Sequence, residues 1–143
     1  MADTYNFTDG SITGGEAATQ QNLFANDVYL LRSTIDFSLQ TLDASETDVA
    51  QAIIIPAGTT VLTAYARVIT TDVGAVFNIG YDGNIDQWGV SLATTADTIV
   101  GGLGSNAPVY FAAANTLDIQ ADASHDLDTL KIEVIAVCIS HVK

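Results

Sequence analysis

Three residues of the sequence have the spacing that begins a calcium-binding loop. Asp82, Asn84 and Asp86 place side-chain oxygens at alternate positions, as the first ligands of such a loop do. Gln87 then stands where the sharp-turn glycine belongs, and Ala93 where the bidentate glutamate should be. We therefore interpret the segment as a hairpin tip with solvated carboxylates, with a weak oxygen-ligated cation as the alternative.

Two further segments contain residue types that catalyse reactions. Ser124, His125 and Asp126 are the residue types of a hydrolase triad, but three consecutive side chains cannot converge in that geometry. Cys138 lies in an apolar segment without a nearby base, so we expect a buried and inert thiol. The only other histidine is His141, which leaves no histidine cluster with metal-ligand spacing. We expect no catalytic residues, no metal and no cofactor, and hence a protein that is not an enzyme.

Exposed aromatic rings are a third candidate, because their faces stack on flat apolar surfaces such as those of sugars. Trp88, Tyr81 and Tyr110 could bind in this way, although a single tryptophan in a β-sandwich usually belongs to the core. Asp118 and Asp122 share one face of a predicted strand, but a chain this rich in aspartate contains such pairs by chance.

The charge of the chain excludes one class of partner. Its 143 residues include 17 acidic and four basic side chains, with a net charge of −13 at neutral pH. No patch can therefore neutralise a row of phosphates, and we expect no binding to nucleic acid. A single cysteine excludes an internal disulfide, which is compatible with a reducing cytosol.

Hydropathy excludes a second class. The apolar runs are much shorter than the ~20 residues of a membrane-spanning helix, so we expect no membrane partner. The polar start of the sequence lacks the basic and apolar regions of a signal peptide, which predicts synthesis in a cytoplasm. With 48% apolar and only 15% charged residues, a chain of this length can bury a core without metal or disulfide.

Short β-strands must position these residues. Apolar and polar residues alternate with a period of two along Val61 to Thr70 and in the last apolar run, as in strands that bury one face. Eight or nine such runs, separated by Gly, Asp, Asn and Thr turns, predict an all-β fold, an antiparallel β-sandwich of jelly-roll or Greek-key type. The expected core-facing residues include Leu62, Ala64, Ala66, Val68, Ile132 and Val134.

Two turns punctuate this pattern. Pro56-Ala57-Gly58 predicts a turn after a strand that ends near Ile55, and Asp82-Gly83 predicts a tight hairpin. Near the end of the sequence, both faces of one strand become apolar. Its second face provides the candidate oligomer contacts Ile135, Val137 and Ile139.

The beginning of the chain has no sustained period. We therefore divide the chain into an irregular N-terminal arm, residues 1–26, and a β-sandwich domain, residues 27–143. A segment with so little periodic apolar surface would become ordered only against a partner. Its large apolar side chains Tyr5, Phe7 and Ile12 are the candidates for binding that partner.

Three stretches together resemble small β-rich virion structural proteins of tailed bacteriophages. They are IIIPAGTTVLTAYARVITT, FNIGYDGNIDQWGVSL and VYFAAANTLDIQADASHDLDTLKIEVIAVCI, within about Asp48 to Ile139. The shared features are an I-P-A-G-T turn, a hairpin near a large hydrophobic residue, an aromatic strand before A-A-N-T-L, and a closing K-I-E-V strand. Head decoration, or cement, proteins of that group are β-sandwiches, often trimeric, that stabilise contacts between coat subunits.

This resemblance implies a partner and a location. The partners would be the major capsid protein and further copies of the chain in a homotrimer, and the location would be the outer capsid surface of a virion. The alternative is a tail-associated carbohydrate- or receptor-binding β-sandwich module.

Overall fold

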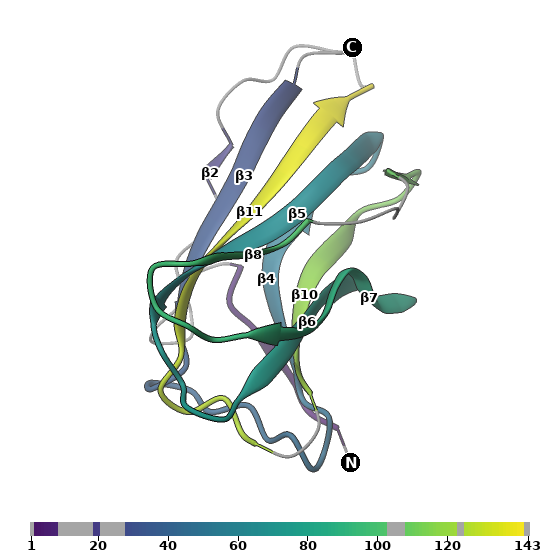
Figure 1. Ribbon diagram of the computed structural model, residues 1–143. Coiled ribbons are helices and arrows are strands. Elements are labelled where there is room, and N and C mark those ends of the chain that lie inside the picture. Colours follow the sequence, from purple (N-terminus) through teal and green to yellow (C-terminus); the bar gives the residue numbers. More distant parts are fainter. Residues whose placement is uncertain (1, 9–18, 21–27, 103–107, 123–124, 142–143) are drawn as a thin grey trace.

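A computed structural model describes residues 2–8, 19–20, 28–102, 108–122 and 125–141. The described residues form two β-sheets and contain no helix. Figure 1 shows β3, β11 and β5 side by side in one layer and β4, β10 and β6 in the other. None of these residues forms a helix that could span a membrane.

The two sheets have interleaved strand orders. Sheet A has the order β1-β4-β10-β6-β7, and sheet B the order β2-β3-β11-β5-β8, with β9 also paired to β5. The strands of sheet A are β1 Thr4–Asn6, β4 Val49–Ile55, β10 Asn115–Asp122, β6 Val76–Tyr81 and β7 Asn84–Ala93. Those of sheet B are β2 Thr19–Gln20, β3 Val28–Asp36, β11 Lys131–Ser140, β5 Thr59–Thr70, β8 Ile99–Gly101 and β9 Val109–Phe111.

This arrangement confirms the predicted all-β sandwich. Among the described residues, all strand pairings are antiparallel except that of β1 with β4, which is parallel. From β3 to β6, consecutive strands alternate between the sheets, an order compatible with a jelly roll. The two predicted turns contain glycines with positive φ, Gly58 at 77° after β4 and Gly83 at 113° in the β6–β7 hairpin.

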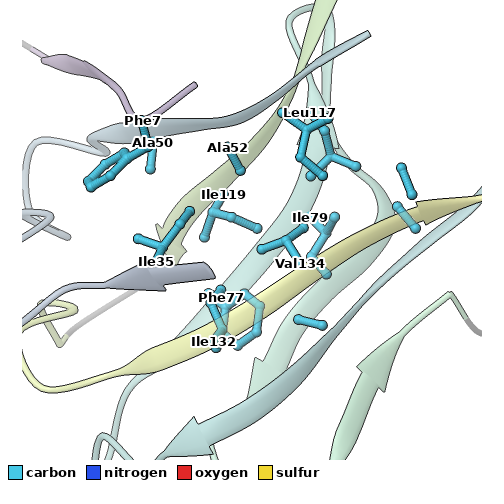
Figure 2. Packing of buried hydrophobic residues seen from close by; sticks show 14 of the residues in the cluster. Phe7, Ile35, Ala50, Ala52, Phe77, Ile79, Leu117, Ile119, Ile132 and Val134 are labelled. Carbon is cyan, nitrogen blue, oxygen red and sulfur yellow. The ribbon is translucent and has the colours of Figure 1, made fainter. Parts of the chain in front are cut away.

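The core lies between the two sheets. Ala64, Ala66 and Val68 of β5 are fully buried, as the sequence predicts, and so are Ile132 and Val134 of β11. Figure 2 shows side chains from both sheets in this space. The sandwich therefore presents two outer surfaces, one on each sheet, to any partner.

Leu62 does not share the burial of these residues, contrary to the prediction. β11 pairs Val137 with Thr63 and Cys138 with Val61, so Leu62 is the extra residue of a β-bulge. Val61 is fully buried and Leu62 only half-buried. The two-residue alternation fails here because a bulge shifts its phase by one position.

The start of the chain is built into sheet A. Thr4–Asn6 pairs with β4, and Phe7 after it is 0% exposed, with its ring 6.0 Å from that of Phe37. Tyr5 is half-buried, whereas Ile12 lies outside the described residues. Phe7 thus fills the core of its own chain. Binding of a neighbouring subunit by these residues, and the boundary of the arm at residue 26, stay predictions.

One buried carboxylate holds β1 against the sheet. Asp48 is 2% exposed, and its Oδ1 accepts a hydrogen bond from the Asp3 N–H at 2.9 Å. Its Oδ2 accepts another from the Asp43 N–H at 3.1 Å. The Val49 N–H donates to the Asp3 carbonyl oxygen, so both backbone polar groups of Asp3 are hydrogen-bonded to the start of β4. Asp48 therefore satisfies backbone donors at the entry to β1 and β4.

Candidate docking face on sheet B

The outer surface of sheet B carries the predicted oligomer contacts. Along β11, Ile135, Val137 and Ile139 occupy the positions between the core-facing residues. Val137 and Ile139 are half-buried, whereas Ile135 is only 4% exposed. The structure thus brings the three residues together on one surface, and their role as oligomer contacts stays a prediction.

Neighbouring strands complete this surface. Ile135 lies between Arg32 and Tyr65, whose long side chains flank it, which accounts for its low exposure. Three cross-strand rows result, namely Arg32–Ile135–Tyr65, Leu30–Val137–Thr63 and Val28–Ile139–Thr60. We call these nine residues, together with Thr34, Glu133 and Arg67 of the next row, the docking face.

Charges of both signs border its apolar centre. Arg32 Nη2 lies 3.8 Å and Arg67 Nε 3.7 Å from the same carboxylate oxygen, Glu133 Oε1. These distances are longer than a hydrogen bond, so the contacts are ionic and not bidentate. Both arginine side chains are about half exposed, at 45% and 48%. A partner can therefore reach them.

Sheet A presents a different outer surface. On β10, Leu117, Ile119 and Ala121 are buried between the sheets, and Asp118 and Asp122 occupy the opposite side, as the alternation predicts. The five strands of sheet A contain no lysine or arginine. The charges of the strands are therefore divided between the two faces, with the cations on sheet B.

Asp118 is buried in spite of lying on the outer side. It is 3% exposed and lines a cleft of about 340 Å³ together with Gln51, Asp82 and Gln120. Burial, assisted by the charge of Asp82, raises the pKa of the Asp118 carboxyl to about 6. The Thr116 hydroxyl, which donates to Oδ1 at 2.7 Å, opposes this rise. Sequence alternation places Asp118 but gives no signal for its burial.

Replacing Asp118 by asparagine is expected to stabilise the protein near pH 7.5. The unfolded carboxyl loses its proton near its ordinary pKa of 3.8, whereas the folded one keeps it to about 6. The contribution of Asp118 to the free energy of unfolding is therefore fully present below pH 4, and it falls by about 3 kcal/mol as the pH rises through 6. Urea denaturation from pH 4 to 8 should show Asp118→Asn equal to wild type at pH 4 and up to about 3 kcal/mol more stable at pH 7.5.

Asp86→Asn is the matched control for that experiment, because it removes a carboxylate from an exposed position. We expect its difference from wild type to stay within about 0.5 kcal/mol across the same range. An Asp118→Asn curve that runs parallel to wild type would show that this carboxyl does not titrate abnormally in the fold.

The remaining candidates from the sequence do not converge. Asp82 and Asp86 are exposed in the β6–β7 hairpin, where the Asn84 amide donates to Gln87 at 2.7 Å. His125 Nε2 faces Asp72 Oδ1 at 3.5 Å, whereas Asp126 accepts from a different segment. Ser124 lies outside the described residues.

Two groups of three potential metal ligands occur among the described residues, and the sequence predicted neither. They are Asp72–His125–Asp128 and Asp3–Glu46–Asp48. In each group the buried carboxylate already accepts two backbone N–H groups, those of Asp128 and Thr129 in the first and those described above for Asp48. Each of these two buried carboxylates therefore connects loop segments of its own chain, and this structural role accounts for its burial.

The Cys138 thiol and most of the aromatic rings that are candidates for sugar binding lie in the interior of the protein. Cys138 is 0% exposed, and burial raises the pKa of its thiol to about 12, which agrees with the predicted inert cysteine. Trp88 is 2% exposed and packs against Tyr81, with 5.8 Å between ring centres. Tyr110 is 58% exposed and lies edge-on to His141. Of the three predicted sugar-stacking rings, Tyr110 alone is strongly exposed.

Solved structures from phage capsids share this fold. A chain in the capsid of Ralstonia phage GP4 matches with a TM-score of 0.69 and 12% identity, over 100% of both chains. A chain in the acidic stable capsid of Helicobacter pylori bacteriophage KHP30 matches at 0.59 and 10%, over 87% of this chain and 95% of that one. A chain in the cyanophage Pam1 capsid asymmetric unit matches at 0.59 and 14%, over 87% and 93%. No protein-family model and no curated protein matches the sequence.

These matches extend over nearly the whole of each chain. The capsid chains are therefore β-sandwiches of about this size and not parts of much larger folds. At 10–14% identity the likeness is one of fold. At that level, the predicted resemblance to small β-rich virion proteins of phages is confirmed.

Proposed function

We propose that the protein is a non-enzymatic decoration, or cement, protein of a tailed phage. It binds the outside of the head, where it stabilises contacts between coat subunits, and it does so as a homotrimer. The observation that carries this proposal is the likeness in fold to small chains of three phage capsids, over 87–100% of this chain.

The distribution of charge supports docking on a particle. Outside the docking face, most of the charged side chains of the strands are carboxylates, which keep the protein soluble before it binds. The docking face combines an apolar centre with arginine and tyrosine at its border, a composition typical of protein interfaces. Coat subunits and further copies of the chain are the partners that a lattice protein must contact.

The absence of a convergent catalytic set among the described residues also supports a structural role. The described acids that are most deeply buried bind backbone N–H groups or neighbouring side chains of their own chain. A tail-associated sugar-binding module is less well supported, because Trp88, the largest candidate for stacking, lies in the core.

The amount of this protein in purified virions tests the proposal. We expect a copy number comparable to that of the coat protein, because a decoration protein repeats with the capsid lattice. Quantitative mass spectrometry of gradient-purified particles, separated into heads and tails, measures it. A copy number equal to that of tail-tip proteins, or recovery with tails alone, would instead favour the receptor-binding module.

A further inference from the structure

We propose that the docking face is the surface through which copies of this chain bind one another. This proposal rests on the proposed function, because it names the surface through which the copies of the homotrimer would contact one another. Its apolar strip, Val28, Leu30, Val137 and Ile139, would form the centre of the contact. Arginine and glutamate side chains at the border would pair between copies.

Charge favours this face for self-association. Copies with a net charge of −13 repel one another, so they approach most easily where that charge is locally cancelled. Strands β3, β11 and β5 carry three of the four cations, Arg32, Arg67 and Lys131, but only two carboxylates, Asp36 and Glu133. The strands of sheet A have carboxylates and no cation to offset them.

Apolar exposure coincides with this charge pattern. Val28 is 58% exposed at one end of the face, and Ile99 of β8, beside Arg67, is 65% exposed. Tyr110 of β9, beside Thr60, is 58% exposed. Large apolar side chains that form one continuous surface with arginine at its border usually lie in contacts between proteins.

The face is also complementary to itself. Because Arg32, Arg67 and Glu133 all lie within it, packing of this face around a threefold axis can bring the arginines of one copy to the carboxylate of the next. The long 3.7 and 3.8 Å contacts within one chain leave room for better geometry between chains. This internal complementarity favours a second copy of the chain over a coat subunit as the partner of the docking face.

Analytical ultracentrifugation of the isolated full-length chain tests the inference. We expect wild type to self-associate, and Val28→Asp and Arg67→Glu each to raise the dissociation constant about tenfold or more. Both positions are exposed, so the variants should fold, which circular dichroism verifies. The matched control is Ile54→Asp, which places the same charge at a 50% exposed aliphatic position on sheet A. Adding Glu133→Arg to Arg67→Glu should restore part of the association.

Three results would overturn the inference. These are a wild-type protein that stays monomeric at its highest soluble concentration, docking-face variants that associate like wild type, or an equal loss in Ile54→Asp. The proposed function is judged separately, by abundance in virions. If the protein is a monomer but abundant on heads, the decoration role stands and the docking face is assigned to the coat. If it is an oligomer but absent from virions, the docking face stands as a self-association surface and the decoration role is rejected.

Discussion

Replacing Gly80 by alanine is expected to lower the free energy of unfolding by about 3 kcal/mol or more. Gly80 lies on β6 opposite Asp118, and the β6–β7 hairpin folds over it so closely that an added Cβ would overlap the backbone carbonyl groups of Asn84 and Ile85. Backbone cannot rotate away as a side chain does, so the hairpin would have to separate from the sheet. Urea denaturation followed by tryptophan fluorescence measures the loss, since Trp88 lies in the same hairpin.

Gly89→Ala provides the matched control on the adjacent strand. A Cβ there would meet the end of the Leu92 side chain, at 2.5 Å from Cδ1, and that side chain can change its rotamer. We expect a loss of about 1 kcal/mol in this variant, because flexible neighbours reduce the cost of added volume. Equal stability of the two variants would show that the close approach of the hairpin to Gly80 does not exist in solution.

Phe7→Ala is expected to lower the free energy of unfolding by about 3–5 kcal/mol. The ring is fully buried, packs edge-on against Phe37, and follows the strand that pairs with β4. Its removal would leave a cavity at the edge of the core and weaken the hold on β1. Thermal and urea unfolding of the isolated protein measure the change.

Leu39→Ala is the control, because it removes an apolar side chain that is 54% exposed and lies outside the docking face, and we expect it to cost under about 1 kcal/mol. Protein concentration adds a second readout. If Phe7 fills the core of its own chain, the destabilisation is the same at every concentration. A loss that shrinks on dilution would mean that Phe7 inserts into a neighbouring copy, as the sequence-based interpretation of an arm predicts, because such a contact stabilises only the associated state.

The sequence predicts most of the sandwich because one face of most strands is buried. Alternation correctly places Ala64, Ala66 and Val68 of β5 in the core, and a glycine with positive φ lies in the turn at both predicted positions. Leu62 is misplaced because nothing local distinguishes a bulge from a continuing strand. The bulge depends on how β5 matches β11, a strand far away in the sequence.

The candidate site is predictable only in part, for a similar reason. Ile135, Val137 and Ile139 stand out because both faces of β11 are apolar. The cations of the docking face do not stand out, since Arg32 and Arg67 become neighbours of Glu133 only through the pairing of three separate strands. The burial of Asp118 likewise arises from the hairpin that covers its side of the sheet, and Phe7 is buried through contacts with β4 and Phe37.

The position of β11 in sheet B constrains when this chain can fold. β11 lies between β3 and β5 and is synthesised after both, so it pairs Val28 with Ile139 and Thr59 with Ser140 across most of the sequence. Until the ribosome has released β11, β3 and β5 have no strand to join them, and their unpaired edges could bind those of other nascent chains. Assembly of sheet B must therefore follow synthesis of β11, at the slow rates of β-proteins with distant strand pairs. The seventeen acidic side chains then have a second effect, because charge repulsion between incomplete chains on the same polysome keeps them from associating.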